Sequence, residues 1–337
     1  MGEESTGAAE KSISINDPKE GARMLGYLWI SFQVVFPILF FMAVGWLIQK
    51  TGLLKAQDFS QLNRLVFRVF LPIKLFSEVY LSDFETAFQP DVVLYGMVGV
   101  LICFLATWFL VSRRVKRKAD LTVLTQAIFR SNYVLFGMSI AASLYPDTNL
   151  GIVSVLAAFV VPLFNVLAVI LFECYREGGR VSPLKIVKGI LTNNLILGSA
   201  LGLLLLGLKI QLPDLVMEPL MDLGEIATPL ALICVGATLS FEALDRYRRE
   251  ICVAALGRLV ICPLIFVGGA LMMGFRGIAL AGLFLVFASP TATSSYPMAK
   301  ELGGNGELAG LIVAVNNVCS LVTIFLWLAL LMSMNLL

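Results

Sequence analysis

The segment 277–302 constrains the fold of this chain more than any other, because it begins as an apolar helix and cannot continue as one. It reads GIALAGLFLVFASPTATSSYPMAKEL, so an apolar run gives way to hydroxyl side chains between Pro290 and Pro297. Backbone groups that proline leaves without partners cannot be hydrated in lipid, so we expect this stretch to be buried in protein or to line a cavity. Many secondary transporters build mid-membrane binding sites from such interrupted helices. The segment therefore favours a transporter.

Composition assigns the chain to the membrane class. Hydrophobic residues make up 58% and charged residues 14% of the 337 residues, and the mean hydropathy is +0.88. A soluble globular protein of this length needs more polar surface. Histidine is absent, which excludes histidine-based metal sites and catalytic triads, and the net charge of +2 does not indicate nucleic acid as a partner. We expect no cofactor, and we interpret the six cysteines as buried apolar residues because they lack CxxC spacing.

The sequence predicts an all-α polytopic membrane protein with ten spans, since a helix of about 20 residues crosses a bilayer. We place the spans near 29–49, 61–81, 92–112, 121–145, 151–173, 184–208, 219–241, 250–273, 277–299 and 308–334. Residues 1–28 are polar and lack the features of a signal peptide, so they are expected to form a mostly disordered tail. Two five-helix repeats are expected at 29–173 and 184–334, joined by a cytoplasmic linker at 174–183.

The distribution of basic residues predicts the orientation of the spans. The connections after the odd-numbered spans contain 15 lysines and arginines, whereas the tail and the opposite connections contain five. Because cytoplasmic connections carry the excess of basic residues, both termini are expected on the non-cytoplasmic side of the plasma membrane.

Two landmarks indicate that the second half repeats the first. Pro72 and Pro229 are 157 residues apart, and adding 157 to position 132 gives Ser289, at the break in the ninth span. Each predicted half has five spans, so the second half is inserted in the opposite orientation. An inverted repeat places a binding site near mid-membrane, where equivalent elements of the two halves meet.

The fourth span carries the charge that most needs an explanation. Arg130 lies about ten residues, or roughly 15 Å, inside the cytoplasmic end of this span, and Ser131 and Asn132 follow it. A charged side chain at that depth is costly unless it faces a cavity or a partner. One interpretation is that Arg130 contacts substrate. The other is that it extends to the interface or braces the carbonyls of a neighbouring helix.

Polar side chains in other spans fall at similar depth, and either line the same cavity or hold helices together. Asn165 lies in the fifth span, and Asn316 and Asn317 lie in the tenth. In the ninth span the candidates are Ser289, Pro290, Thr291 and Ser294. In the second span Lys74 and Glu78 are four residues apart and are expected to pair. They serve as an interface anchor or line a surface along which a moving domain slides.

The charges that are missing are also informative. The third to fifth and eighth to tenth spans contain no acidic residue away from their ends, and their cationic residues are Arg130 and Arg258. An antiporter with paired buried carboxylates is therefore disfavoured. Cationic and neutral donors, together with helix termini, are suited to an anion and in particular to a carboxylate.

Five segments in this order resemble the auxin efflux carrier family of permeases, over nearly the whole chain from about residue 30. They are LNRLVFRVFLPIKLFSEV, FRSNYVLFG, VVPLFNVLAVI, ALGRLVICPLI and ASPTATSSYPMAKELG. The family includes the plant PIN carriers and bacterial permeases assigned to malate, malonate and related acids. The resemblance implies a ten-helix inverted repeat, shared with bile-acid symporters and sodium/proton antiporters, in which the broken helices 4 and 9 cross at the binding site.

The resemblance also implies roles for particular helices and residues. Helices 1, 2, 6 and 7 form a scaffold and often a dimer interface, and the other six form a transport domain that moves as an elevator. The family's crossing-point residues correspond to Asn132, and to Pro290 with Ser289 and Thr291 beside it. This chain differs at Ser139, where relatives commonly have proline.

Our hypothesis is a secondary transporter that moves a small organic anion by alternating access. One alternative is a sodium-coupled symporter, because amides and freed carbonyls coordinate sodium without carboxylates. The other is a membrane-embedded enzyme, which is weakened because the sequence shows no nucleophile–base pair, metal cluster or phosphate loop.

The orientation is testable with a reporter that works only in the cytoplasm. Fused to Leu337, the reporter should give no signal. The excess of basic residues places the connections after the odd-numbered spans in the cytoplasm, and therefore the C-terminus on the opposite side of the membrane. The same reporter fused after Arg117 is the positive control. A strong signal from the Leu337 fusion would overturn the orientation.

Overall fold

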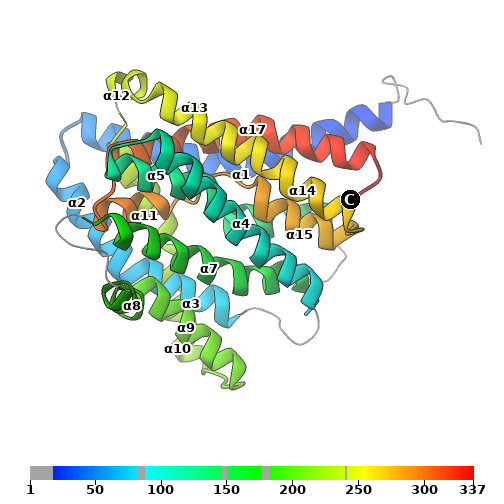
Figure 1. Cartoon of the computed structure of the whole chain (residues 1–337), viewed down its shortest axis with the longest axis horizontal. Coiled ribbons are helices and arrows are strands. Elements are labelled where there is room, and N and C mark those ends of the chain that lie inside the picture. The colour runs from blue at the N-terminus through cyan, green and yellow to red at the C-terminus, as the bar shows by residue number, and fades with distance from the viewer. Residues whose placement is uncertain (1–17, 82–87, 146–149, 177–182, 240) are drawn as a thin grey trace, which may run out of the picture.

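The computed structural model describes residues 18–81, 88–145, 150–176, 183–239 and 241–337. These residues are helical almost throughout (Figure 1), and the β-structure among them is a single isolated bridge. The helices of the first part of the chain are α1 (Pro18–Lys50), α2 (Ala56–Leu65), η1 (Val66–Phe70), α3 (Leu71–Tyr80), α4 (Pro90–Arg114), α5 (Lys118–Phe129), α6 (Tyr133–Leu144) and α7 (Gly151–Tyr175).

The remaining helices are α8 (Pro183–Leu191), α9 (Asn194–Gly207), α10 (Asp214–Glu225), α11 (Ala227–Ala237), α12 (Phe241–Arg246), α13 (Arg248–Leu256), η2 (Gly257–Ile261), α14 (Cys262–Met272), α15 (Gly277–Ala288), α16 (Ser295–Glu301) and α17 (Gly306–Ser333). Helices fall at each of the ten predicted spans. The fourth and ninth spans are each divided in two, as α5 with α6 and as α15 with α16.

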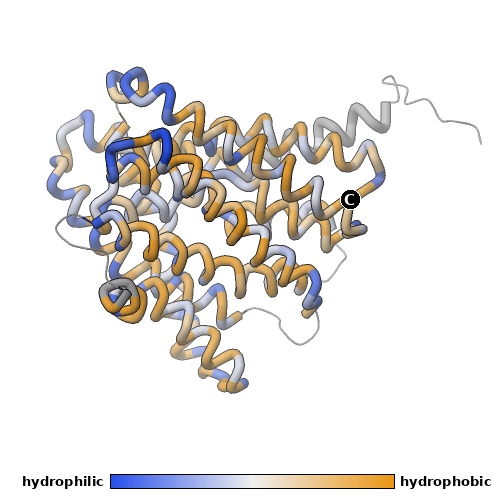
Figure 2. Tube along the Cα trace, in the orientation of Figure 1, coloured by the Kyte–Doolittle hydropathy of each residue, from blue (hydrophilic) through white to orange (hydrophobic). Residues whose placement is uncertain are grey.

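The lengths and surfaces of the helices are those of a multi-pass membrane protein. Within the described residues, five helical stretches are long and apolar enough to span a membrane: Pro90–Arg114, Gly151–Tyr175, Asp214–Ala237, Arg248–Met272 and Gly306–Ser333. Large apolar side chains are exposed on several helices, including Met272 at 91% and Leu215 at 86%. Figure 2 shows apolar residues along most of the bundle. A surface of this kind is suited to lipid and not to water.

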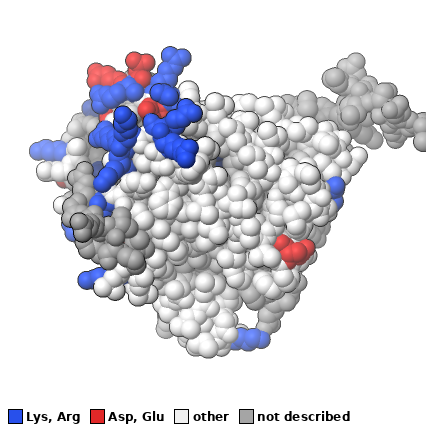
Figure 3. Space-filling view, viewed as in Figure 1, with Lys and Arg blue, Asp and Glu red and all other residues white. Residues whose placement is uncertain are grey.

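Charged residues gather at one end of the bundle. Figure 1 places the beginning of α1 and the end of α17 together at the opposite end, to the right. Figure 3 shows most of the visible basic side chains at the left, around the ends of α5, α12 and α13. This arrangement agrees with the charge asymmetry found in the sequence.

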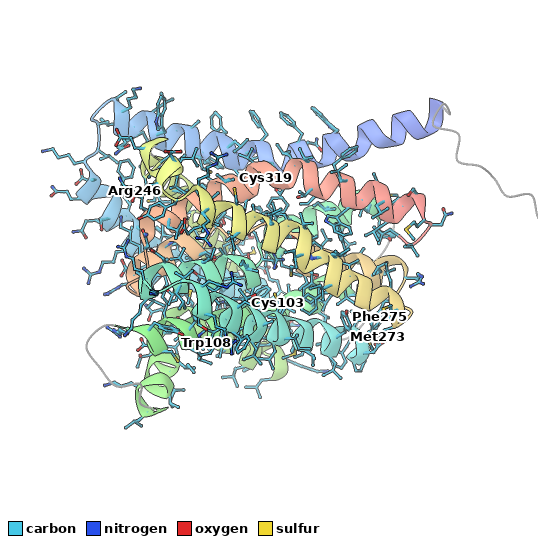
Figure 4. The ribbon with its side chains drawn as sticks, turned by 45° about the horizontal axis from the view of Figure 1, so that its top comes forward. Cys103, Trp108, Arg246, Met273, Phe275 and Cys319 are labelled. Carbon is cyan, nitrogen blue, oxygen red and sulfur yellow. The ribbon has the colours of Figure 1, made fainter. Side chains whose placement is uncertain are left out.

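Helix α1 begins earlier than the sequence analysis predicted. Residues 18–28 were expected to belong to the polar tail, but α1 begins at Pro18 and continues to Lys50 (Figure 4). Proline is favoured in the first helical turn, and Lys, Glu, Ala, Arg, Met and Leu in this segment propagate a helix well. Residues 1–17, which complete the expected tail, and residues 177–182 of the expected linker lie outside the described residues.

Two prolines inside spans account for the two π-helical segments. Pro72 and Pro263 each lie two residues after the end of a π-helical segment, η1 and η2 respectively. A proline inside a helix removes a hydrogen bond from the carbonyl four residues earlier. The freed carbonyl of Arg68 accepts from Asn194 Nδ2 at 3.0 Å, and that of Leu259 accepts from Trp327 Nε1 at 3.1 Å. Side chains of distant helices therefore replace the bonds that the prolines remove, as the membrane interior requires.

Glycines bring α1 and α11 into close contact. A Cβ atom on Gly236 would overlap the carbonyl oxygen of Met42, and one on Gly45 would overlap that of Ile233. Small residues of this kind allow helix backbones to approach closely in membranes. The pair α1–α11 therefore packs backbone against backbone.

Gly236→Ala should lower the melting temperature of the purified protein, because overpacking of a close contact costs on the order of 1–3 kcal/mol. Gly268→Ala is the matched control, since an added Cβ there meets nothing within 4 Å and α14 is also apolar. Equal melting temperatures for the two variants would show that the α1–α11 contact is not tight.

Candidate functional site

The interruptions of the two divided helices meet inside the bundle. Ser131 and Thr291 form an isolated antiparallel bridge. The Asn132 N–H donates to the Pro290 carbonyl at 2.8 Å, and the Ala292 N–H donates to the Arg130 carbonyl at 3.3 Å. Each extended segment therefore supplies partners for backbone groups that the other leaves outside a helix. This exchange keeps non-helical backbone tolerable inside the bundle, where it is buried in protein.

Arg258, on η2, completes the backbone hydrogen bonding at the C-terminal ends of α5 and α15. Its Nε donates to the Ser289 carbonyl at 2.7 Å and one terminal nitrogen donates to the Val286 carbonyl at 2.6 Å. The other terminal nitrogen donates to the carbonyls of Ile128 and Phe129 at 3.1 and 3.2 Å. The side chain is fully buried. A cation at the C-terminal ends of two helices is also favoured by their dipoles.

Arg130 lies at the C-terminal end of α5 and is 3% exposed. One terminal nitrogen donates to Asn165 Oδ1 at 2.7 Å and to Ser294 Oγ at 2.9 Å. The other contacts Met298 Sδ at 2.7 Å. These partners are neutral, and no carboxylate of the described residues forms an ion pair with Arg130. A buried guanidinium charge therefore has no opposite charge beside it in the described part of the chain.

A small cavity of about 60 Å³ adjoins this cation. The interrupted helices line it with Arg130, Ser131, Asn132 and Ser294, and the first turn of α6 adds Tyr133 and Val134. The opposite wall includes Lys74 and Glu78 of α3 and Thr228 of α11. Lys74 Nζ and Glu78 Oε1 are 3.2 Å apart, so the ion pair that the sequence predicted is present and faces the cavity.

A larger cavity of about 500 Å³ shares Lys74, Leu135 and Thr228 with the small one. Its lining extends to Gln33 of α1 and to Ser143, near the end of α6. The small cavity alone holds roughly two waters, since water occupies about 30 Å³ in the liquid. The two spaces together have the volume typical of a small-molecule site, about 300–1,000 Å³.

The ten residues predicted for the site fall into two groups. Arg130, Ser131, Asn132 and Ser294 line the small cavity. Asn165 lies behind Arg130, and Thr291 accepts from Asn316 Nδ2 at 2.7 Å and donates to the Ala127 carbonyl at 2.7 Å. Ser289 and Pro290 contribute carbonyl acceptors, and Asn317 donates to the Val313 carbonyl within its own helix. None of this second group lines the small cavity, and all of its members except Asn317 form hydrogen bonds at the interruptions.

Several buried polar atoms around the interruptions have no hydrogen-bond partner in the described residues. They are Ser131 Oγ, Asn132 Nδ2, Asn165 Nδ2, Ser295 Oγ, Asn316 Oδ1 and Asn317 Oδ1. Unpartnered polar atoms are uncommon in protein interiors and are expected where water or a ligand binds. No cluster of three or more potential metal-binding His, Cys, Asp or Glu side chains occurs in the described segments.

Sequence analysis assigned no role to Arg258 and treated Lys74 and Glu78 mainly as interface residues. The signal that marked Arg258 was its charge inside an apolar span, five residues before Pro263. The carbonyls that Arg258 binds belong to segments about 30 and 130 residues away in sequence. The spacing of residues in the sequence therefore could not predict which carbonyls these are.

A bundle of apolar helices with two interrupted helices meeting at a polar cavity defines a polytopic membrane transport protein. A family described as membrane transport protein matches residues 30–328, so the chain belongs to this family, which confirms the resemblance to the auxin efflux carrier family found in its motifs. The chain is also 24% identical over 302 residues to an uncharacterized transporter of Methanothermobacter thermautotrophicus, covering 88% of this chain and 97% of that protein. Family membership supports a transporter.

Arg258→Gln should strongly destabilise the protein, because an amide cannot reach all four carbonyls and each buried group left unpartnered costs about 1–3 kcal/mol. Arg276→Gln is the control, since Arg276 also donates to two carbonyls but is exposed. We expect a large loss of melting temperature or of folded yield only for Arg258→Gln, measured by thermal unfolding and size-exclusion chromatography. Similar behaviour of the two variants would contradict the role of Arg258.

Proposed function

We propose that the protein is a secondary transporter of a small organic anion that carries a carboxylate. The observation that carries the proposal is the buried guanidinium of Arg130, which has only neutral partners and lies at a cavity. A buried cation without an opposite charge is costly, and a bound anion offsets that cost. A carboxylate also matches the planar fork of donors that arginine presents.

Other groups at the cavity support the same class of substrate. Ser131 Oγ and Asn132 Nδ2 lack partners and are available to bind a ligand. The first turn of α6 lines the cavity, so the positive end of its helix dipole favours negative charge there. Lys74 adds a second cation on the opposite wall, but Glu78 compensates its charge. Among the charged side chains that line the small cavity, Arg130 is therefore the one without a partner of opposite charge, whereas the carboxylate of Glu225 lines the larger cavity.

We propose alternating access of the elevator type, between two groups of helices. Helix α1 packs against α11, and α3 packs against α9 and α10, which supports a scaffold of the first, second, sixth and seventh spans. Helix α1 also packs against α17, so in this proposal the α1–α17 contact belongs to the boundary between the two groups. The other group contains the interrupted helices with α4, α7, α13, α14 and α17, which pack on one another. The small cavity lies between Lys74, Glu78 and Thr228 of the scaffold and Arg130 and Ser294 of the second group. A substrate held by the second group would move with it along the scaffold.

The same proposal includes an inverted repeat of 29–173 and 184–334, with the two interrupted helices crossing at equivalent positions. It is supported by the bridge between Ser131 and Thr291, where the two interruptions meet. It is also supported by the spacing of 157 residues that relates Asn132 to Ser289 and Pro72 to Pro229. The proposal places both termini on the non-cytoplasmic side of the plasma membrane. In that orientation the larger cavity, which extends to Ser143 near the end of α6, would admit the substrate from the non-cytoplasmic side.

A sodium-coupled symporter is the second candidate. Asn316 Oδ1 and Asn317 Oδ1 on α17 are buried oxygen atoms without partners in the described residues. Oxygen ligands suit hard cations. If sodium binds there, a sodium gradient would drive uptake.

A thermal-shift and uptake experiment tests the proposed function. We expect malonate, malate or acetate to raise the melting temperature of the purified protein and to enter proteoliposomes that contain it. Sodium dependence of both effects would favour the symporter. The absence of any shift or uptake with all three acids would contradict a carboxylate substrate.

Arg130→Gln should reduce the affinity for the stabilising acid by about 2–5 kcal/mol, the range for truncating one partner of a buried charge pair. Arg130→Lys should recover part of it, because an ammonium lacks the bidentate fork. The measurement is the ligand-induced thermal shift, and Arg276→Gln is the control. A stable Arg130→Gln variant with an unchanged shift would exclude contact with substrate. An Arg130→Gln variant that unfolds in the absence of ligand would show that Arg130 holds neighbouring helices together and has a structural role.

A further inference from the structure

A third cavity, of about 680 Å³, lies on the opposite side of η2 from the site, between α4 and the α13–α14 helix. Its apolar lining includes Ile102, Leu110, Val253, Ile261 and Ile265. Each of these side chains is between 42% and 63% exposed, so the cavity is an open groove on the lipid-facing surface. Figure 4 shows α4, marked by Cys103 and Trp108, along this side of the bundle.

One end of the groove is basic. Arg114, Lys116, Arg117 and Arg249 line it there, together with Asp120 and Glu250. Figure 3 shows basic side chains gathered at this end of the bundle. Asp120 is engaged by Asn305 Nδ2 at 2.7 Å and lies 3.7 Å from Arg117. Within the described residues, no ion pair involves Arg114, Lys116 or Arg249, nor the carboxylate of Glu250 at the same end. Three cations therefore outnumber the one remaining carboxylate at the mouth and are available to bind an anion.

The dimensions of the groove match one leaflet of a bilayer. Ile102 and Arg114 are 12 residues apart on α4, which corresponds to about 18 Å of helix. Half of the hydrocarbon core of a bilayer is about 15 Å thick. A chain lying in the groove would therefore extend from the basic mouth to about mid-membrane.

We propose that this groove binds one anionic phospholipid from the leaflet on the basic side of the membrane. Its phosphate lies among Arg114, Lys116 and Arg249, and an acyl chain lies along Leu110, Val253 and Ile265. Charge complementarity selects the occupant, because a zwitterionic lipid or an apolar protein helix leaves the three cations without a partner. This lipid site is separate from the two cavities that share Lys74, and the proposal does not depend on the proposed substrate.

Native mass spectrometry of the full-length protein with phosphatidylglycerol and phosphatidylcholine of identical acyl chains tests this proposal. The wild type should retain phosphatidylglycerol preferentially. The triple variant Arg114→Gln/Lys116→Gln/Arg249→Gln should lower that preference at least about tenfold, since each basic side chain at an anionic surface raises affinity about fivefold. Lys50→Gln/Lys55→Gln/Arg64→Gln removes the same charge elsewhere and should keep the preference.

The apolar part of the groove is tested separately with Ala106→Trp, which fills an exposed position of the lining and leaves the cations in place. Retention of both lipids should fall, while the melting temperature without added lipid should not. The proposal is overturned if the wild type shows no preference, if the two triple variants lose it equally, or if Ala106→Trp retains lipid like the wild type.

Discussion

The hydrogen bonds from Arg258 to the carbonyls of α5 and α15 are the interaction on which the rest of the structure depends. Two helices that end inside a membrane protein leave carbonyl groups that neither water nor lipid can satisfy. A single guanidinium binds four of them, from both helices, and its charge is favoured by both dipoles. It therefore fixes the two interruptions relative to each other. Without it, the non-helical segments at 130–132 and 289–294 would leave these carbonyls unpartnered, which costs about 1–3 kcal/mol for each buried group.

This arrangement separates two tasks between two arginines. Arg258 binds backbone carbonyls and is fully buried, so its charge is committed to the fold. Arg130 binds the side chains of Asn165, Ser294 and Met298 beside a cavity, so its charge remains to be compensated. In our account the first holds the interruptions and the second attracts the anion.

The residues alone predicted helices at the expected spans and the interruption of the ninth span, because apolar length and a hydroxyl-rich break are local properties. The interruption of the fourth span was implied by the family resemblance. The sequence also identified Arg130 and Asn132 as candidate site residues, because both lie deep inside the fourth predicted span. It did not predict which side chains satisfy the freed carbonyls. Asn194 binds the carbonyl of Arg68 and Trp327 binds that of Leu259, and these partners are 126 and 68 residues apart. Asn317 shows the converse, since its bond to Val313 lies within its own helix although its depth suggested the cavity.

The central claim is that the interruptions face a water-accessible space that a substrate occupies. Labelling of Ser294→Cys with a small hydrophilic thiol reagent tests it most directly, in a protein whose six native cysteines are replaced. Ser294 is partly exposed and lines the small cavity, whereas a cysteine at the buried Ser320 serves as the unreactive control. We predict that Ser294→Cys reacts and that a transported carboxylate slows the reaction. Complete inertness in membranes, with and without the acid, would contradict the account and leave the break as a packing feature.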